Sequence, residues 1–228
     1  MSINYVFDDN GIYIRNLANN GDELGIAQYR FPHNYELIGK EFKVAGNTIT
    51  IKCRFFAEVN GAECKYECEK LEKDMYFVQL GLDCAVLDLE KGQAALVLGG
   101  EVIVGAIEGI GTEAPAFAGD EMVETDVLWI MGCGRYIEQE FISADTVRTA
   151  WAPRDEKKAD NSYKAVKFRN SFYFVVAESG DLKNFCAPFF TRRVALLEDY
   201  ERCMAVGSVM GEGFDPIVVS AYAKFRDQ

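Results

Sequence analysis

The chain has 228 residues, of which 36 are acidic and 24 are basic, so its formal net charge is −12. Such an acidic balance argues against binding to nucleic acid, which needs a basic surface. Apolar residues make up 49% of the sequence, too many for a disordered chain. The length suffices for one large domain or two small ones.

Several features bear on where the protein resides. No stretch is long and apolar enough to cross a bilayer, and the first residues lack the basic and apolar regions of a signal peptide. The seven cysteines have no regular spacing, which is typical of reduced thiols. We therefore expect a cytoplasmic protein with no membrane partner.

The first half of the chain alternates between apolar and polar residues, which is the period of a half-buried β-strand. From Thr48 to Phe55, the apolar residues Ile49, Ile51 and Cys53 share one face with Phe55. Further strands are expected at Ala62–Glu69, Tyr76–Val78, Ala85–Leu89, Ala94–Leu98 and Val102–Ile107. Short strands joined by tight turns predict an antiparallel barrel or sandwich.

A weak internal repeat divides the chain. Three residues of the first half recur 97 positions later, so that Tyr66, Lys70 and Tyr76 return as Tyr163, Lys167 and Tyr173. Ala85–Asp88 similarly resembles Ala195–Glu198, at a shift of 110. The repeat predicts two similar β units, residues 1–114 and 115–228, joined by the Gly- and Ala-rich segment Gly109–Gly119.

The repeated pattern also resembles a known family. The order runs from Gly39-Lys40-Glu41-Phe42 through a Gly turn, an alternating strand and the motif Tyr-x9-Tyr-Phe-Val to an aliphatic strand with an acidic residue. Repeated twice, this order resembles the MoaF family. That resemblance implies an all-β fold of two lipocalin-like (calycin) antiparallel barrels in tandem. The family name carries a label of molybdenum-cofactor biosynthesis.

A more distant similarity is to the phenolic acid decarboxylases, which are also calycin barrels. Their Tyr-x-Tyr pair is absent, because Phe42-x-Val44 and Trp129-x-Met131 stand at those positions. Only Glu72 and Arg148 fall near the Glu and Arg that these enzymes use. The similarity therefore does not predict decarboxylation.

Aromatic and polar residues gather on the inward strand faces of the second unit. The candidate ligand-binding residues are Trp129, Gln139, Arg148, Trp151 and Tyr163. The aromatic residues would stack on a ligand and Gln139 would hold a polar group, whereas Arg148 contributes only if its strand shifts by one residue. Core packing around a bonded amide is the alternative. We expect a small, partly aromatic metabolite to bind in the second barrel.

Two other classes of function are open. A cofactor-independent lyase, isomerase or cyclase would use Tyr163 or Tyr173 as the acid and Glu178 or Glu72 as the base. A non-catalytic structural subunit would use the strand Tyr76–Val78, which is apolar on both faces, as an interface between the two units or between the chains of a homo-oligomer.

No motif predicts a metal or a cofactor. Cys64 and Cys68 are four residues apart on a strand, roughly 13 Å by the usual rise, which is too far to share one ion. The Gly-x-Gly motifs do not open a helix after a strand, as a nucleotide fingerprint requires. His33, the only histidine, follows Pro32 in an expected turn. We therefore expect neither a metal nor a cofactor.

Overall fold

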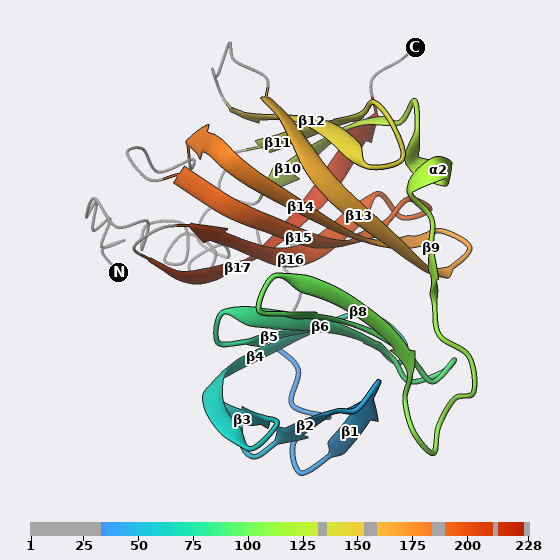
Figure 1. The fold of residues 1–228 in the computed structure, drawn as a ribbon, viewed down its shortest axis with the longest axis vertical. Helices are drawn as coiled ribbons and strands as arrows, with labels where there is room; N and C mark the ends of the chain where they lie inside the picture. Colours follow the sequence, from blue (N-terminus) through green and yellow to red (C-terminus); the bar gives the residue numbers. More distant parts are fainter. Residues whose placement is uncertain (1–32, 132–135, 153–158, 184–189, 212–213, 226–228) are drawn as a thin grey trace, which may run out of the picture.

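Figure 1 shows the fold of the protein as a computed structural model, which describes residues 33–131, 136–152, 159–183, 190–211 and 214–225. Two antiparallel β-barrels follow one another along the chain, so the all-β expectation is confirmed. The described residues include one short helix, α2 (Gly119–Met122), and no helix there is long and apolar enough to span a membrane.

The first barrel is an eight-stranded meander in which each strand pairs with the next. Its strands are β1 (Glu41–Val44), β2 (Asn47–Ile51), β3 (Phe56–Val59), β4 (Ala62–Glu72), β5 (Met75–Leu80), β6 (Asp83–Asp88), β7 (Gln93–Leu98) and β8 (Glu101–Ala106). A single bridge between Val44 and Ile107 brings the first strand beside the last. The barrel is therefore nearly closed.

The second barrel is fully closed. Its strands are β10 (Asp126–Met131), β11 (Tyr136–Phe141), β12 (Thr146–Ala152), β13 (Ala159–Arg169), β14 (Phe172–Lys183), β15 (Phe190–Asp199), β16 (Met204–Gly211) and β17 (Phe214–Phe225). Pairing of β10 with β17 and of β12 with β13 completes the ring, and β9 (Ala116–Phe117) adds to one edge of β13.

The structure corrects one predicted strand. The expected strand Thr48–Phe55 ends at Ile51, because the backbone amides of Lys52 and Cys53 both donate to the carbonyl of Phe56 and turn the chain into β3. The side chain of Phe55 is 60% exposed, not inward as its alternation predicts. The period of two continues through the turn by coincidence, so the pattern alone could not mark the end of the strand.

The internal repeat is visible in the strand pairing. Tyr76 of β5 pairs with Leu87 of β6, and Tyr173 of β14 pairs with Glu198 of β15. Since Tyr76 matches Tyr173, Glu198 takes the place of Leu87. The shift of 110 expected from the sequence is wrong by one residue, and such a slip exchanges the two faces of a strand. Glu198 therefore belongs to the inward face of its barrel.

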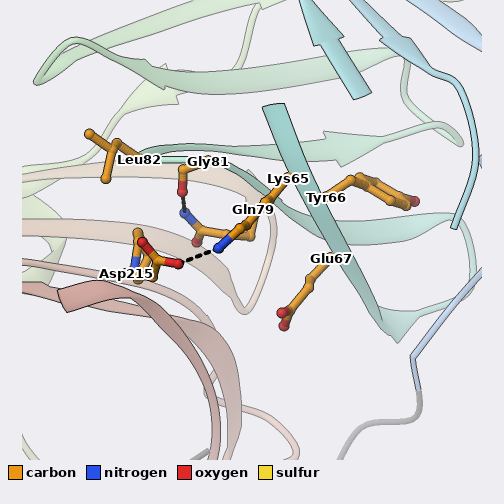
Figure 2. A pocket seen from close by; sticks show the side chains of 8 residues that line it. Lys65, Tyr66, Glu67, Gln79, Gly81, Leu82 and Asp215 are labelled. Carbon is orange, nitrogen blue, oxygen red and sulfur yellow. Dashed lines mark hydrogen bonds and ion pairs between the residues drawn. The ribbon is translucent and has the colours of Figure 1, made fainter. Parts of the chain in front are cut away.

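The two barrels meet along an apolar seam. Phe77 from β5 and Phe174 from β14 face each other there, with ring centroids 6.5 Å apart, inside one cluster of buried residues from both barrels. All six residues of β5 are buried, since one face lines its own barrel and the other covers the second barrel. Polar contacts flank the seam, such as the ion pair of Lys65 with Asp215 in Figure 2.

Candidate functional site

The interior of the second barrel contains three of the predicted ligand-binding residues. Trp129 and Gln139 have no exposed surface, and the indole Nε1 of Trp129 donates a hydrogen bond of 2.8 Å to Oε1 of Gln139. Tyr163 is also buried, and its hydroxyl lies 3.0 Å from the carbonyl oxygens of both Gly119 and Ser143. The hydroxyl of Tyr163 thus bridges the start of helix α2 and the turn before β12.

The other two predicted ligand-binding residues do not join this group. Arg148 lies on the outer face of β12, where its guanidinium pairs with Asp160 at 2.7 Å and with Glu140 at 3.7 Å. These carboxylates raise the pKa of Arg148. Trp151 pairs with Ile137 through the backbone, and its side chain lies outside the described residues.

The candidate catalytic residues are scattered. The hydroxyl of Tyr173 donates to Glu121 of α2 at 2.8 Å. Glu178 is exposed and pairs with Arg193, while Glu72 pairs with Arg202 from the turn after β15. No carboxylate from this predicted set enters the barrel, so these residues do not form the expected acid–base pair.

The structure instead places a different carboxyl group inside the second barrel. Glu198 has no exposed surface, and its Oε2 accepts a hydrogen bond of 2.8 Å from the hydroxyl of Tyr200. Burial away from water raises the pKa of Glu198 to about 8, although the nearby Tyr200, Trp129 and Gln139 favour the charged form. The carboxyl group is therefore mostly neutral at pH 7.

Two polar atoms of this cluster make no close, well-aligned hydrogen bond among the described residues, although the Gln139 amide lies near enough to Glu198 to favour its charged form. They are Oε1 of Glu198 and Nε2 of Gln139, and both belong to fully buried side chains. The amide orientation of Gln139 follows from the indole of Trp129, because an N–H donor must meet the amide oxygen. Buried polar atoms are nearly always paired, so this pair of atoms needs an explanation.

The first barrel shows that such a cluster is not required by the fold. The strand pairs and turns of the two barrels can be superposed residue by residue. Trp129 then corresponds to Val44, Gln139 to Ile49, Glu198 to Leu87 and Tyr200 to Leu89. Four aliphatic residues thus fill one barrel where two aromatic and two polar residues occupy the other. The same backbone is stable with an apolar interior, so the polar group marks the second barrel as different.

Aromatic rings lie between this cluster and the surface. The ring of Tyr200 packs edge-on against both Trp129, at 5.9 Å, and Tyr173, at 5.7 Å. On the outer side, Tyr173 and Tyr200 border a depression of about 370 Å³ that is also lined by Glu121 and Ser171. Tyr200 therefore stands between this depression and Glu198.

The sequence reasoning missed Glu198 and Tyr200. Their positions follow from the strand register, in which Tyr173 pairs with Glu198 just as Tyr76 pairs with Leu87. Sequence similarity alone gave a different register. Among the described residues, no group of three His, Cys, Asp or Glu side chains could hold a metal ion.

Comparison with known protein families and with curated proteins finds no match for this chain. The resemblance to the MoaF family therefore stays a prediction. Barrels serve many functions, so the chemistry of the site itself is the guide to what this protein does.

Proposed function

We propose that the second barrel binds a small, partly aromatic molecule through a carbonyl or other oxygen acceptor. The observation that carries this proposal is a pair of fully buried atoms that make no close, well-aligned hydrogen bond, Oε1 of Glu198 and Nε2 of Gln139. A ligand that completes both hydrogen bonds removes the cost of leaving two polar atoms buried without partners, which is about 1–3 kcal/mol for each atom.

The protonation state of Glu198 determines whether the ligand has to present a hydrogen-bond acceptor or a donor. Tyr200 donates to Oε2, which places the carboxyl proton on Oε1. With a pKa of about 8, the group is neutral at pH 7, so Oε1 and the amide Nε2 of Gln139 both act as donors. Two buried donors suit a ligand with an acceptor oxygen, and the indole of Trp129 with the ring of Tyr200 supplies aromatic surface in the same cluster.

The experiment is native mass spectrometry and a crystal structure of the protein purified from its own cells. We expect added mass, together with density in contact with Glu198 and Gln139. Glu198→Leu and Gln139→Ile install the residues of the first barrel, so these variants should fold and lose the added mass. Density for an ordered water alone, or a bound mass that both variants retain, would overturn the proposal.

A second candidate function is cofactor-independent acid–base catalysis of the lyase or isomerase type. The raised pKa of Glu198 favours it, because a general acid works best with a pKa near the operating pH. Once the bound molecule is known, Glu198→Gln should retain binding and abolish turnover of that molecule. Equal turnover by this variant and the wild type would exclude catalysis by Glu198.

A further inference from the structure

The mouth of the first barrel contains a separate pocket of about 590 Å³. Its wall comes from three segments that are distant in the sequence: His33–Tyr35, Arg54–Phe56 and Lys65–Cys68. Large aromatic side chains are unusually open to solvent here, since Tyr35 is 45% exposed, Phe55 60% and Phe56 42%. None of these residues belongs to the cluster around Glu198.

The second barrel shows why this pocket exists. There, the backbone of Gly119 lies so close to Ala144 that a Cβ on Gly119 would come within 2.0 Å of the carbonyl oxygen of Ala144. The hydroxyl of Tyr163 contacts the carbonyls of Gly119 and Ser143 at the same point. The end of the second barrel is therefore sealed by backbone packed against backbone.

The first barrel cannot form this seal because it has larger residues at the matching positions. The bridge of His33 to Glu69 matches the pairing of Phe117 with Val166, which sets Tyr35 at the place of Gly119. The turns before β3 and β12 have the same hydrogen bonds, which sets Arg54 at the place of Ala144. The large side chains of Tyr35 and Arg54 thus prevent the close backbone contact that Gly119 and Ala144 make in the second barrel.

Tyr66 is the counterpart of Tyr163 and lacks its hydrogen bonds. Tyr66 is only 3% exposed, and its buried hydroxyl has no oxygen or nitrogen partner among the described residues, only the thiol of Cys68, a weak acceptor, beside it. In Figure 2 its ring points away from Lys65 and Asp215, toward the opposite side of β4. Tyr66 lines the pocket, so its hydroxyl is a polar group that a ligand there can satisfy.

Arg54 supplies a positive charge. Its guanidinium carbon lies 5.0 Å from the ring centroid of Tyr35 and 5.1 Å from that of Phe55, and Nη2 donates to the hydroxyl of Tyr35 at 3.0 Å. Within the described part of the chain, no carboxylate pairs with Arg54. The two rings hold the guanidinium in place and leave donors for an anion.

We propose that this pocket binds a small organic anion that carries an aromatic ring system. The rings of Tyr35, Phe55 and Phe56 provide apolar surface for the ligand's aromatic part. Arg54 pairs with its anionic group, and the hydroxyl of Tyr66 donates a further hydrogen bond. The site is separate from the one around Glu198, so each can exist without the other.

The probes are 8-anilino-1-naphthalenesulfonate and N-phenyl-1-naphthylamine, which share their rings but differ in the sulfonate group. Fluorescence titration of the full chain should give tighter binding of the sulfonate. Arg54→Gln should weaken the sulfonate roughly 10-fold, the loss expected for a charge-assisted hydrogen bond, and change the uncharged dye by less than about twofold. Because Arg54 is exposed, the fold should tolerate this change.

Three matched variants locate the dye. Tyr66→Phe should weaken the sulfonate severalfold, while its counterpart Tyr163→Phe and the second-barrel variant Glu198→Leu should leave its affinity unchanged. The proposal is wrong if Arg54→Gln leaves the sulfonate's affinity intact or weakens both dyes equally. It is also wrong if Glu198→Leu abolishes binding, which would place the dye in the second barrel.

Discussion

Arg169 holds the carboxylate of Asp88 with two hydrogen bonds across the seam between the barrels. Nε donates to Oδ2 at 2.7 Å and Nη2 donates to Oδ1 at 2.6 Å. Asp88 comes from the end of β6 and has no exposed surface, while the side chain of Arg169, at the end of β13, is 17% exposed. The pair thus couples the barrels through a buried, bidentate contact, the geometry in which an ion pair is strongest.

Removing the guanidinium should destabilise the protein, because it leaves the carboxylate of Asp88 buried without its counter-charge. We expect Arg169→Met to lower the free energy of unfolding by about 3 kcal/mol. Urea denaturation followed by circular dichroism measures the change. The double variant Arg169→Met with Asp88→Leu should recover part of this loss, since no charge is then left unpaired.

The pair of Lys65 with Asp215 is the matched control, because it also crosses the seam but both of its side chains are exposed. Lys65→Met should change the free energy of unfolding by less than about 1 kcal/mol. Equal losses for Lys65→Met and Arg169→Met would mean that burial does not set the strength of the seam contacts.

Glu198 should make the protein less stable as pH rises. Its pKa is about 8 when folded and near 4.5 when unfolded, so the folded state retains a proton that the unfolded state releases. The contribution of Glu198 to stability is therefore greatest below pH 4.5 and falls between pH 4.5 and 8, by at most about 1.4 kcal/mol for each pH unit. Urea midpoints of the wild type and Glu198→Gln across this range measure the effect.

Glu198→Gln should lack this decline, because a glutamine does not titrate. The difference between the two proteins should then grow in favour of the variant from pH 5 to pH 8. Parallel curves for the two proteins would show that Glu198 is charged in the folded state, and would remove the basis for a neutral donor in the second barrel.

A contact present in both barrels predicts the opposite dependence on pH. Glu36 accepts hydrogen bonds from Lys70, at 2.6 Å, and from Tyr76, at 2.7 Å, and Glu121 accepts from the matching Lys167 and Tyr173. Lys70 and Tyr76 lower the pKa of Glu36 to about 2. Its contribution is therefore complete above pH 4.5 and is lost as pH falls toward 2.

Thermal unfolding between pH 2 and pH 7 tests this contact. Glu36→Gln should lower the melting temperature at pH 7, and the difference from the wild type should shrink as the solution is acidified. Lys40 is exposed and is not one of the residues that donate a hydrogen bond to Glu36, so Lys40→Gln serves as a control whose effect should not shrink in the same way. A constant difference for Glu36→Gln would contradict the prediction.

The sequence predicts the parts of this fold that depend on local pattern. Alternation correctly predicts the strand that turns Tyr66 and Cys68 inward. The repeat at 97 residues correctly identifies Tyr173 as the counterpart of Tyr76. Gln139 is buried, as its strand parity predicts. These features depend on local alternation along one strand, or on a repeated motif that can be read from the sequence.

The features that the sequence did not reveal depend on contacts between distant segments. Glu198 was matched to Asp88 by sequence similarity, whereas the strand pairing sets it one residue away, at the place of Leu87. Phe55 continues an alternating pattern through a turn, and only the hydrogen bonds to Phe56 end the strand. The pocket beside Arg54 likewise depends on which residues replace Gly119 and Ala144 in the other barrel.

The two matched tyrosines should respond differently to loss of the hydroxyl. Tyr163→Phe removes the donor for the carbonyls of Gly119 and Ser143, so we expect the free energy of unfolding to fall by about 1–2 kcal/mol. Tyr66→Phe removes a buried hydroxyl that has only the weakly accepting thiol of Cys68 beside it, so stability should stay the same or rise slightly. Urea denaturation of both variants gives the comparison. An equal loss for Tyr66→Phe would mean that its hydroxyl is already satisfied, which would remove one of the three contacts assigned to the ligand of the first barrel.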